Sequence, residues 1–171
     1  MVGRVTFKGS PMTLQGKRLR EGGRVPNFKV IAQDLKEVTL ANFKGRIKVI
    51  TTFLSLDTPV CDLQVKEFNK RATGFSAEVV VLGISMDLPF AQKRFCQMNE
   101  IKNAVVLSDY RFSSFGKNYG LLIKELNLLA RAVLIVDKEE RLRYVQIVRE
   151  LTNPPDYDDV LRHLEEIIRN H

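Results

Sequence analysis

The sequence predicts an α/β protein in which a central mixed β-sheet is flanked by helices. Two continuous apolar runs, residues 47–54 and 78–85, have the length and composition of strands that are buried on both faces. Each run is followed by a segment of helical spacing that begins with a proline, Pro59 in the first case and Pro89 in the second. This alternation is typical of a parallel sheet with helices packed on it.

The N-terminal part is predicted to be a β-hairpin extension of that core. Residues 2–19 form short alternating segments on either side of Lys8-Gly9-Ser10-Pro11, a composition that is typical of turns. We assign the hairpin to residues 1–20. Residues 1–171 are treated as a single domain, because a chain of 171 residues suits one continuous core.

The middle of the chain is predicted to begin with a strand at 28–32, an extended piece or turn at 38–43 and the strand at 47–54. A helix at 59–73, the strand at 78–85 and a helix at Pro89–Met98 follow. A strand at 104–107 then leads into a helical or irregular stretch up to Tyr119. The first helix is indicated by apolar residues at Val60, Leu63, Phe68 and Ala72.

The C-terminal part is predicted to be a hairpin followed by a helix. Strands at 132–137 and 141–148 are joined by Lys138-Glu139-Glu140, which is short enough for a hairpin turn. The closing helix, 156–169, has one apolar face formed by Val160, Leu161, Leu164, Ile167 and Ile168. The complete order of elements fits a thioredoxin-like fold that carries an N-terminal β-hairpin extension.

Composition and charge indicate a folded cytoplasmic protein. Hydrophobic residues make up 44% of the chain, yet no apolar run approaches the roughly 20 residues that a membrane span needs. The first residues lack the apolar block of a secretory signal, so we expect a cytoplasmic location and no membrane partner. The net charge of +7 comes from scattered basic residues that often neighbour acids, as in Lys36-Glu37, so no nucleic-acid partner is expected.

The two cysteines, Cys61 and Cys96, are either inert buried thiols or redox groups, because a structural disulfide is not expected in a reducing cytoplasm. No metal site is expected. The only histidines, His163 and His171, lie at the C-terminal end, and a Zn²⁺ site would need carboxylates from elsewhere. The chain has no CxxC motif and no Gly-rich phosphate loop, and no cofactor is predicted.

Cys61 is the strongest candidate for a catalytic residue. Proline favours the first helical position and Thr58 is a good N-cap, so Cys61 should be the third residue of the helix. The unpaired N–H groups and the positive end of the helix dipole favour a thiolate at that position. Cys61 is therefore a candidate nucleophile. The alternative is that Cys61 is a small buried apolar residue and Thr58 only a cap.

Cys96 is expected in the body of the next helix, where the dipole offers no advantage. Phe90, Phe95 and Met98 surround it in the sequence, so taken alone it is best interpreted as a core thiol. The presence of Cys61 changes that interpretation, because a sulfenic acid formed at Cys61 needs a second thiol with which to condense.

Two segments of the chain are very specific: LDTPVCD at residues 56–62 and ISMDLPFAQKRFC at residues 84–96. Shorter ones are LSDYR at 107–111, SFGKNYG at 114–120, LARAV at 129–133 and PDY at 155–157. Together these segments strongly resemble the bacterial thiol peroxidases, the atypical two-cysteine peroxiredoxins. The resemblance covers essentially the whole chain, including the N-terminal hairpin.

The resemblance implies a thioredoxin-like fold and a thiol-dependent peroxidase that reduces hydrogen peroxide and organic hydroperoxides. It implies that Cys61 is the peroxidatic cysteine and Cys96 the resolving cysteine. The two are implied to form an intramolecular disulfide, which thioredoxin or a similar dithiol reduces again. The resemblance also implies a homodimer. Thr58 is implied to hydrogen-bond the sulfur and the peroxide, and Arg131 to stabilise thiolate and transition state. A hydroxyl can both donate and accept, and a guanidinium stays protonated, which suits these roles.

The chain departs from the family pattern at two places. Leu54 stands seven positions before Cys61, where the family usually has proline, and Glu125-Leu126-Asn127-Leu128 replaces a Pro/Gly-containing loop. Leucine supplies apolar cover but not the fixed φ of proline, so the question that Leu54 raises concerns peroxide access and rate rather than fold.

Three other functions compete with the peroxidase. A disulfide oxidoreductase would normally carry the CxxC motif that is missing here. A redox sensor or binding module would use the same cysteine pair to switch a partner surface, and it would oxidise slowly without turnover by thioredoxin. Nucleic-acid binding is the remaining alternative, and it would have to survive physiological salt.

Overall fold

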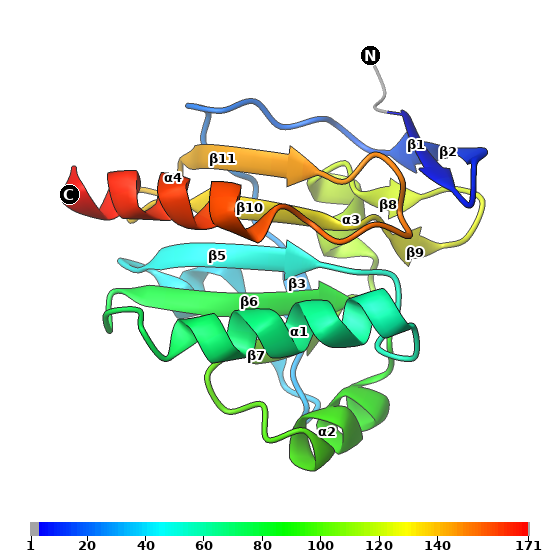
Figure 1. Cartoon of the computed structure of the whole chain (residues 1–171), viewed down its shortest axis with the longest axis horizontal. Coiled ribbons are helices and arrows are strands. Elements are labelled where there is room, and N and C mark those ends of the chain that lie inside the picture. Colours follow the sequence, from blue (N-terminus) through cyan, green and yellow to red (C-terminus); the bar gives the residue numbers. More distant parts are fainter. Residues whose placement is uncertain (1–3, 171) are drawn as a thin grey trace.

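The computed structural model describes residues 4–170, which form two β-sheets with helices around the larger one (Figure 1). The larger sheet has seven strands in the order β11-β10-β5-β6-β7-β3-β4. Their bounds are β3 Lys29–Ile31, β4 Glu37–Thr39, β5 Ile47–Thr52, β6 Val79–Ser85, β7 Val105–Ser108, β10 Ala132–Val136 and β11 Leu142–Ile147. The pairs β5–β6 and β6–β7 are parallel and the others antiparallel, which confirms the mixed sheet.

Helices cover both faces of this sheet. They are η1 (Leu40–Phe43, a 3₁₀ helix), α1 (Pro59–Ala72), α2 (Pro89–Met98), α3 (Ser114–Asn118) and α4 (Tyr157–Arg169). In Figure 1, α1 and α4 lie in front of the sheet, α3 lies behind it, and α2 lies beyond β7 at the lower edge. The predicted thioredoxin-like arrangement is thereby confirmed. No helix within residues 4–170 is long and apolar enough to cross a membrane.

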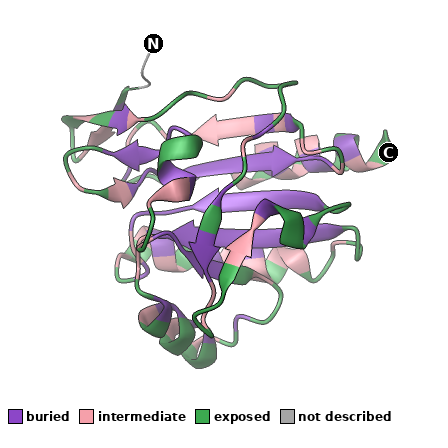
Figure 2. Cartoon of the chain, turned by 180° about the vertical axis from the view of Figure 1, so that it is seen from behind, coloured by how far each residue is buried: buried purple, intermediate pink, exposed green. Residues whose placement is uncertain are grey.

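The continuous apolar runs form the central strands. Every residue of β5 and β6 is buried, as expected for strands with neighbours on both edges and layers on both faces (Figure 2). The two proline-initiated helices also begin where the sequence predicts, at Pro59 and Pro89. This arrangement places the first turn of α1 next to the end of β5, at the edge where the two specific sequence segments meet.

The N-terminal hairpin is formed by β1 (Arg4–Phe7) and β2 (Ser10–Gln15). Lys8 (φ 51°) and Gly9 (φ 82°) form its two-residue turn, and both have the positive φ that tight hairpin turns need. Residues 1–3 of the predicted hairpin lie outside the described residues. The hairpin does not join the larger sheet. It belongs to a second sheet of order β1-β2-β8-β9, in which β8 is Leu122–Ile123 and β9 is Leu128–Leu129.

The buried face of α1 differs from the apolar pattern that indicated the helix. Cys61, Gln64, Val65 and Phe68 are buried, whereas Leu63 is 63% exposed. The positions 61, 64, 65 and 68 follow helical spacing, so the face is regular. It includes the polar Gln64, because the candidate site lies under this helix. Of the apolar residues that indicated the helix, Phe68 is on the buried face and Leu63 is the one that is exposed.

Candidate active site

Cys61 is the third residue of α1 and has no exposed surface. It lies in a cluster with Phe53, Leu54 and Leu56, which come from the loop between β5 and α1. The first helical hydrogen bond of α1 runs from the Asp62 N–H to the Thr58 carbonyl (3.0 Å), so the N–H groups of residues 60 and 61 have no acceptor within the helix. The sulfur is therefore next to backbone donors that favour negative charge.

Thr58 is at the N-cap position, but its side chain does not cap the helix. Its hydroxyl donates to the Ser55 carbonyl (2.9 Å) and so closes the turn that leads into α1. The prediction of a capping side chain is therefore wrong. Among the hydrogen bonds of residues 4–170, none joins the Thr58 side chain to Cys61, and the lone pairs of the hydroxyl oxygen remain available to a substrate proton.

Arg131, directly before β10, contacts Cys61. Its Nη1 donates to the Cys61 sulfur (3.2 Å), and the guanidinium is 2% exposed. No ion pair found within residues 4–170 involves Arg131, so no carboxylate compensates this buried charge. An uncompensated buried charge is costly, and a thiolate at Cys61 is the anion within reach. The structure thus directs a charged donor of Arg131 at the sulfur of the predicted nucleophile.

Gln64 is a site residue that the sequence analysis missed. Its Oε1 accepts from Arg131 Nη1 (2.7 Å), and its Nε2 donates to the Thr51 hydroxyl (2.5 Å) and the Thr52 carbonyl (3.0 Å). Gln64 thus connects the guanidinium to the end of β5. A signal was present in the sequence, because Gln64 follows Cys61 by three residues and must share its helix face.

Cys96 lies near the end of α2 and is 8% exposed. Phe95 packs with it in the same cluster as Cys61, but Phe90 and Met98 are 65% and 77% exposed and do not form the predicted enclosure. The Gln33 amide donates to its sulfur (3.4 Å). Burial raises the pKa of the Cys96 thiol, and the Gln33 hydrogen bond opposes that increase. Both cysteines are free thiols in this structure.

A cavity of about 620 Å³ separates the two helices that carry the cysteines. One wall is the first turn of α1 with the loop before it, including Thr58 and Asp62, and the other is α2, including Phe95 and Met98. Asp87 lies between the walls. Its carboxylate accepts from the Ser55 hydroxyl (2.9 Å) and from the Leu56 N–H (3.0 Å), and so holds the loop before α1 against the start of α2.

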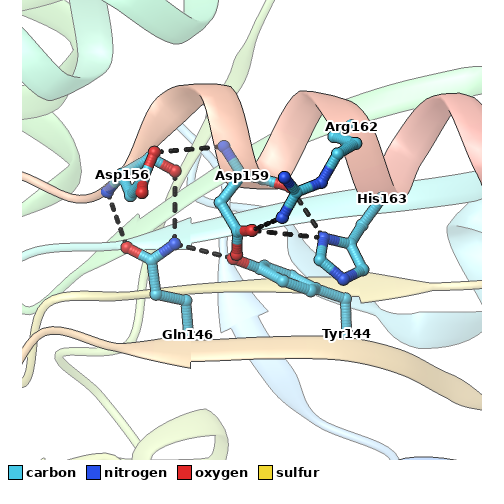
Figure 3. Close-up of polar contacts among 6 residues, drawn as sticks. All are labelled: Tyr144, Gln146, Asp156, Asp159, Arg162 and His163. Carbon is cyan, nitrogen blue, oxygen red and sulfur yellow. Dashed lines mark hydrogen bonds and ion pairs between the residues drawn. The ribbon is translucent and has the colours of Figure 1, made fainter.

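His163 belongs to a separate polar cluster between α4 and β11 (Figure 3). Its Nδ1 lies 2.8 Å from the Asp159 carbonyl oxygen, and its ring packs on Tyr144 with centroids 4.5 Å apart. The Tyr144 hydroxyl donates to Asp159 (2.6 Å) and accepts from Gln146 (2.7 Å). His163 is thus held by its contact with the Asp159 carbonyl and by ring packing on Tyr144, and the contacts drawn in Figure 3 do not include either cysteine.

Two further features bear on ligands. Within residues 4–170, no group of three or more His, Cys, Asp or Glu side chains is arranged to hold a metal ion. A second cavity, of about 1250 Å³, has basic residues from two segments in its walls, namely Lys17, Arg18, Arg20, Arg24 and Lys117. Four of these five basic residues lie within residues 17–24, and none of the five lines the cavity between α1 and α2.

A thioredoxin-like sheet with a buried cysteine in the first turn of the helix after β5 defines a thiol-based redox protein. The Redoxin family model matches residues 20–161, and the chain belongs to that family. Within the family it belongs to the thiol peroxidases, because the relatives at close to half identity over nearly the whole chain carry that description.

The thiol peroxidase of Oceanobacillus iheyensis is 47% identical over 95% of this chain and 98% of its own length. That of Halalkalibacterium halodurans is 48% identical over 92% of this chain and 94% of its own. Among solved structures, a peroxiredoxin-like protein from Aquifex aeolicus is 44% identical, covers 97% of this chain and 98% of its own, and superposes with a TM-score of 0.90. The resemblance stated from the sequence is therefore confirmed.

Proposed function

We propose that this protein reduces hydrogen peroxide and organic hydroperoxides through Cys61. The observation that carries the proposal is the hydrogen bond from the buried Arg131 guanidinium to the Cys61 sulfur, in a site without a carboxylate to neutralise Arg131. A thiolate is a strong nucleophile, and a preorganised cation next to it stabilises the negative charge that develops on the departing oxygen.

The reaction proceeds in three balanced steps. The Cys61 thiolate attacks one peroxide oxygen, the O–O bond breaks, and the other oxygen leaves as water or alcohol after taking a proton, which leaves a sulfenic acid on Cys61. The Cys96 thiol then attacks that sulfur, a disulfide forms and water leaves. A dithiol of the thioredoxin type reduces the disulfide by thiol–disulfide exchange and restores both thiols.

Three groups assist the first step. Arg131 holds the thiolate and the departing oxygen. The oxygen of the Thr58 hydroxyl, a residue that lines the cavity, accepts a hydrogen bond from the peroxide O–H, since the Thr58 O–H itself donates to the Ser55 carbonyl. The N–H of Cys61, which has no helical acceptor, donates to the attacked peroxide. Leu54 supplies apolar cover in the cluster around Cys61, where it is 3% exposed.

We propose a cytoplasmic homodimer with thioredoxin or a similar dithiol as the partner. Exposed apolar side chains on α1 and α2 support an association at this face, in particular Leu63, Phe90 and Met98. Sedimentation of the wild type beside Phe90→Ser tests this, with Leu35→Ser as a control on an exposed apolar residue elsewhere. Dissociation by Phe90→Ser alone supports the dimer, whereas a monomeric wild type contradicts it.

The test of the reaction is peroxide consumption coupled to oxidation of reduced thioredoxin. The wild type should turn over, and Cys61→Ser should lose all activity, because serine offers essentially no alkoxide near neutral pH. Residual activity above a few per cent would remove Cys61 from the nucleophile role. A protein whose cysteines oxidise slowly with peroxide and show no thioredoxin-dependent turnover would instead be the redox sensor.

A further inference from the structure

Arg131 is oriented mainly by one backbone carbonyl. Its Nε and Nη2 both donate to the Leu151 oxygen, at 3.0 and 2.7 Å. Leu151 is fully buried and lies after β11, twenty residues beyond Arg131 in the chain. Because two donors of a planar guanidinium share this acceptor, the position of the Leu151 carbonyl determines where the third donor, Nη1, meets the Cys61 sulfur.

The turn that contains Leu151 is closed by Glu150. The Asn153 N–H donates to the Glu150 carbonyl (2.9 Å), which makes residues 150–153 a β-turn with Leu151 inside it. The Glu150 carboxylate accepts from the Thr152 N–H (2.9 Å) and the Thr152 hydroxyl (2.6 Å). The conformation of the turn therefore depends on the negative charge of one side chain.

The same carboxylate binds the N-terminal hairpin. It accepts from the Thr6 hydroxyl (2.9 Å), the Gly9 N–H (2.8 Å) and the Lys8 N–H (3.3 Å). Hydrogen bonds from Thr152, Gly9 and Thr6 lower the pKa of Glu150 to about 2, so it stays ionised at neutral pH.

Backbone hydrogen bonds complete the connection between the hairpin and the turn. The Thr6 N–H donates to the Arg149 carbonyl and the Leu151 N–H donates to the Thr6 carbonyl, both at 2.8 Å. Leu151 thus binds the hairpin through its N–H and Arg131 through its carbonyl. The order of contacts runs from hairpin to Leu151, then Arg131, then Cys61.

We propose that Glu150, together with the hairpin strand that contains Thr6, is a positioning residue for Arg131. The second sheet then has a function in the reaction, since it holds the backbone on which the guanidinium rests. This inference depends on the role proposed for Arg131 and Cys61. A displacement of a preorganised donor by about an ångström lowers a rate strongly, so loosening the turn should slow the first step without removing any group that touches the peroxide.

The experiment compares Glu150→Ala and Thr6→Val with the control Glu125→Ala. Glu125 also binds the hairpin, through the Thr13 N–H (2.6 Å), and has a lowered pKa for that reason, but it has no hydrogen bond to the turn at 150–153. Two quantities are measured: the rate of a single oxidation by peroxide, and the pH dependence of Cys61 alkylation in a Cys96→Ser background. Melting temperatures are recorded in parallel, and all rates are measured well below them.

Glu150→Ala removes all five hydrogen bonds of the carboxylate and should slow oxidation by about threefold to tenfold, the range expected when the one hydrogen bond from Arg131 to the reacting sulfur is weakened. Its alkylation profile should move to higher pH, because a displaced guanidinium stabilises the thiolate less. Thr6→Val loses one side-chain hydrogen bond and should show a smaller change of the oxidation rate and of the alkylation profile in the same direction. This variant keeps the proposal testable if Glu150→Ala does not fold. Glu125→Ala should retain the wild-type rate and profile.

A lower melting temperature with unchanged oxidation rate and alkylation profile in both Glu150→Ala and Thr6→Val would overturn the proposal, because Glu150 would then serve stability alone. Equal effects of Glu125→Ala would also overturn it, since any loosening of the hairpin would suffice. Failure of the proposed function is a separate result: the wild type itself would not react with peroxide, whereas the alkylation profiles would still report the position of Arg131.

Discussion

The surroundings of Cys61 and Cys96 differ although both thiols are buried in the same cluster. Cys61 lies in the first turn of its helix and receives a hydrogen bond from a guanidinium, whereas Cys96 lies near the end of its helix and receives one from the neutral amide of Gln33. Burial raises the pKa of Cys96. Burial therefore does not distinguish the two thiols, which differ instead in the charge and the backbone donors around each sulfur.

The second difference lies in the helices. Five of the ten residues of α2 are exposed, against three of the fourteen residues of α1. Exposed residues run along α2 in Figure 2. The buried Gln92 Oε1 has no hydrogen-bond partner among residues 4–170, a cost that unwinding relieves. The helix of the resolving cysteine is therefore the less firmly held of the two.

The largest expected effect separates the two cysteines directly. Cys96→Ser should abolish thioredoxin-dependent turnover but keep one oxidation of Cys61 per chain at close to the wild-type rate, because only resolution needs the second thiol. Stopped-flow oxidation with one equivalent of peroxide measures the first step. If Cys96→Ser and Cys61→Ser lose that step equally, the two thiols do not have separate roles.

Arg131→Lys should produce the next largest effect. A compact ammonium on a flexible stem cannot donate to Leu151, Gln64 and Cys61 together, so the first oxidation should slow by at least about tenfold, or about 1.4 kcal/mol in barrier. The same stopped-flow measurement checks this, with Cys96 alkylation in the Cys61→Ser background as the control that should not change. Unchanged kinetics would assign Arg131 to structure alone.

Disulfide formation should unwind α2. A disulfide requires Cα atoms within about 7 Å, and in the present structure Cys61 and Cys96 are free thiols on two different helices with a cavity between them. Hydrogen exchange by mass spectrometry should therefore show faster exchange around residues 90–99 and at the start of α1 after oxidation, while β6 and β10 stay protected. Peroxide-treated Cys96→Ser should show no such change in α2. Identical exchange patterns in the reduced and oxidised wild type would show that the sulfurs bond without unwinding.

The smallest effect concerns the environment of Cys96. Since burial raises the pKa of the Cys96 thiol above that of a free thiol, alkylation of Cys96 in Cys61→Ser should increase only at a higher pH than alkylation of a free thiol. Because the pKa of this thiol is higher in the folded than in the unfolded protein, its contribution to stability is fully present below the unfolded-state pKa. That contribution is lost as the pH rises through the folded-state pKa. Gln33→Ala removes the hydrogen bond that lowers this pKa, so its alkylation profile should move slightly further up. A shift to lower pH would contradict the assignment.

Much of the fold could be predicted because local signals coincide with the final structure. The runs that become β5 and β6 are apolar on both faces, and Pro59 and Pro89 mark helix starts that depend on local backbone geometry alone. Strands β8 and β9 are different. Each has two residues and exists because β2 pairs with β8, a long-range contact that leaves no periodic pattern in a window of sequence.

The residues of the candidate site likewise include some that local sequence signals indicate and others that only the fold brings together. Cys61 could be found from its place after Pro59, and Arg131 through the family resemblance of the segment at 129–133. Gln64 and the Leu151 carbonyl could not be placed, since their roles depend on which segments the fold brings to Arg131. The misassigned capping role of Thr58 has a similar cause: the side chain bonds to Ser55, and only the turn geometry shows this.

The central claim, that Cys61 is the thiol that reacts with peroxide, is tested most directly by trapping the sulfenic acid. Reduced wild type, Cys61→Ser and Cys96→Ser are treated with one equivalent of peroxide and a sulfenic-acid-specific dione, and the adduct is located by mass spectrometry. We expect an adduct on Cys61 in Cys96→Ser and no adduct in Cys61→Ser. The wild type should give little adduct, because Cys96 converts the sulfenic acid to a disulfide. An adduct on Cys96 in Cys61→Ser, formed at a rate similar to that of Cys61, would contradict the central claim.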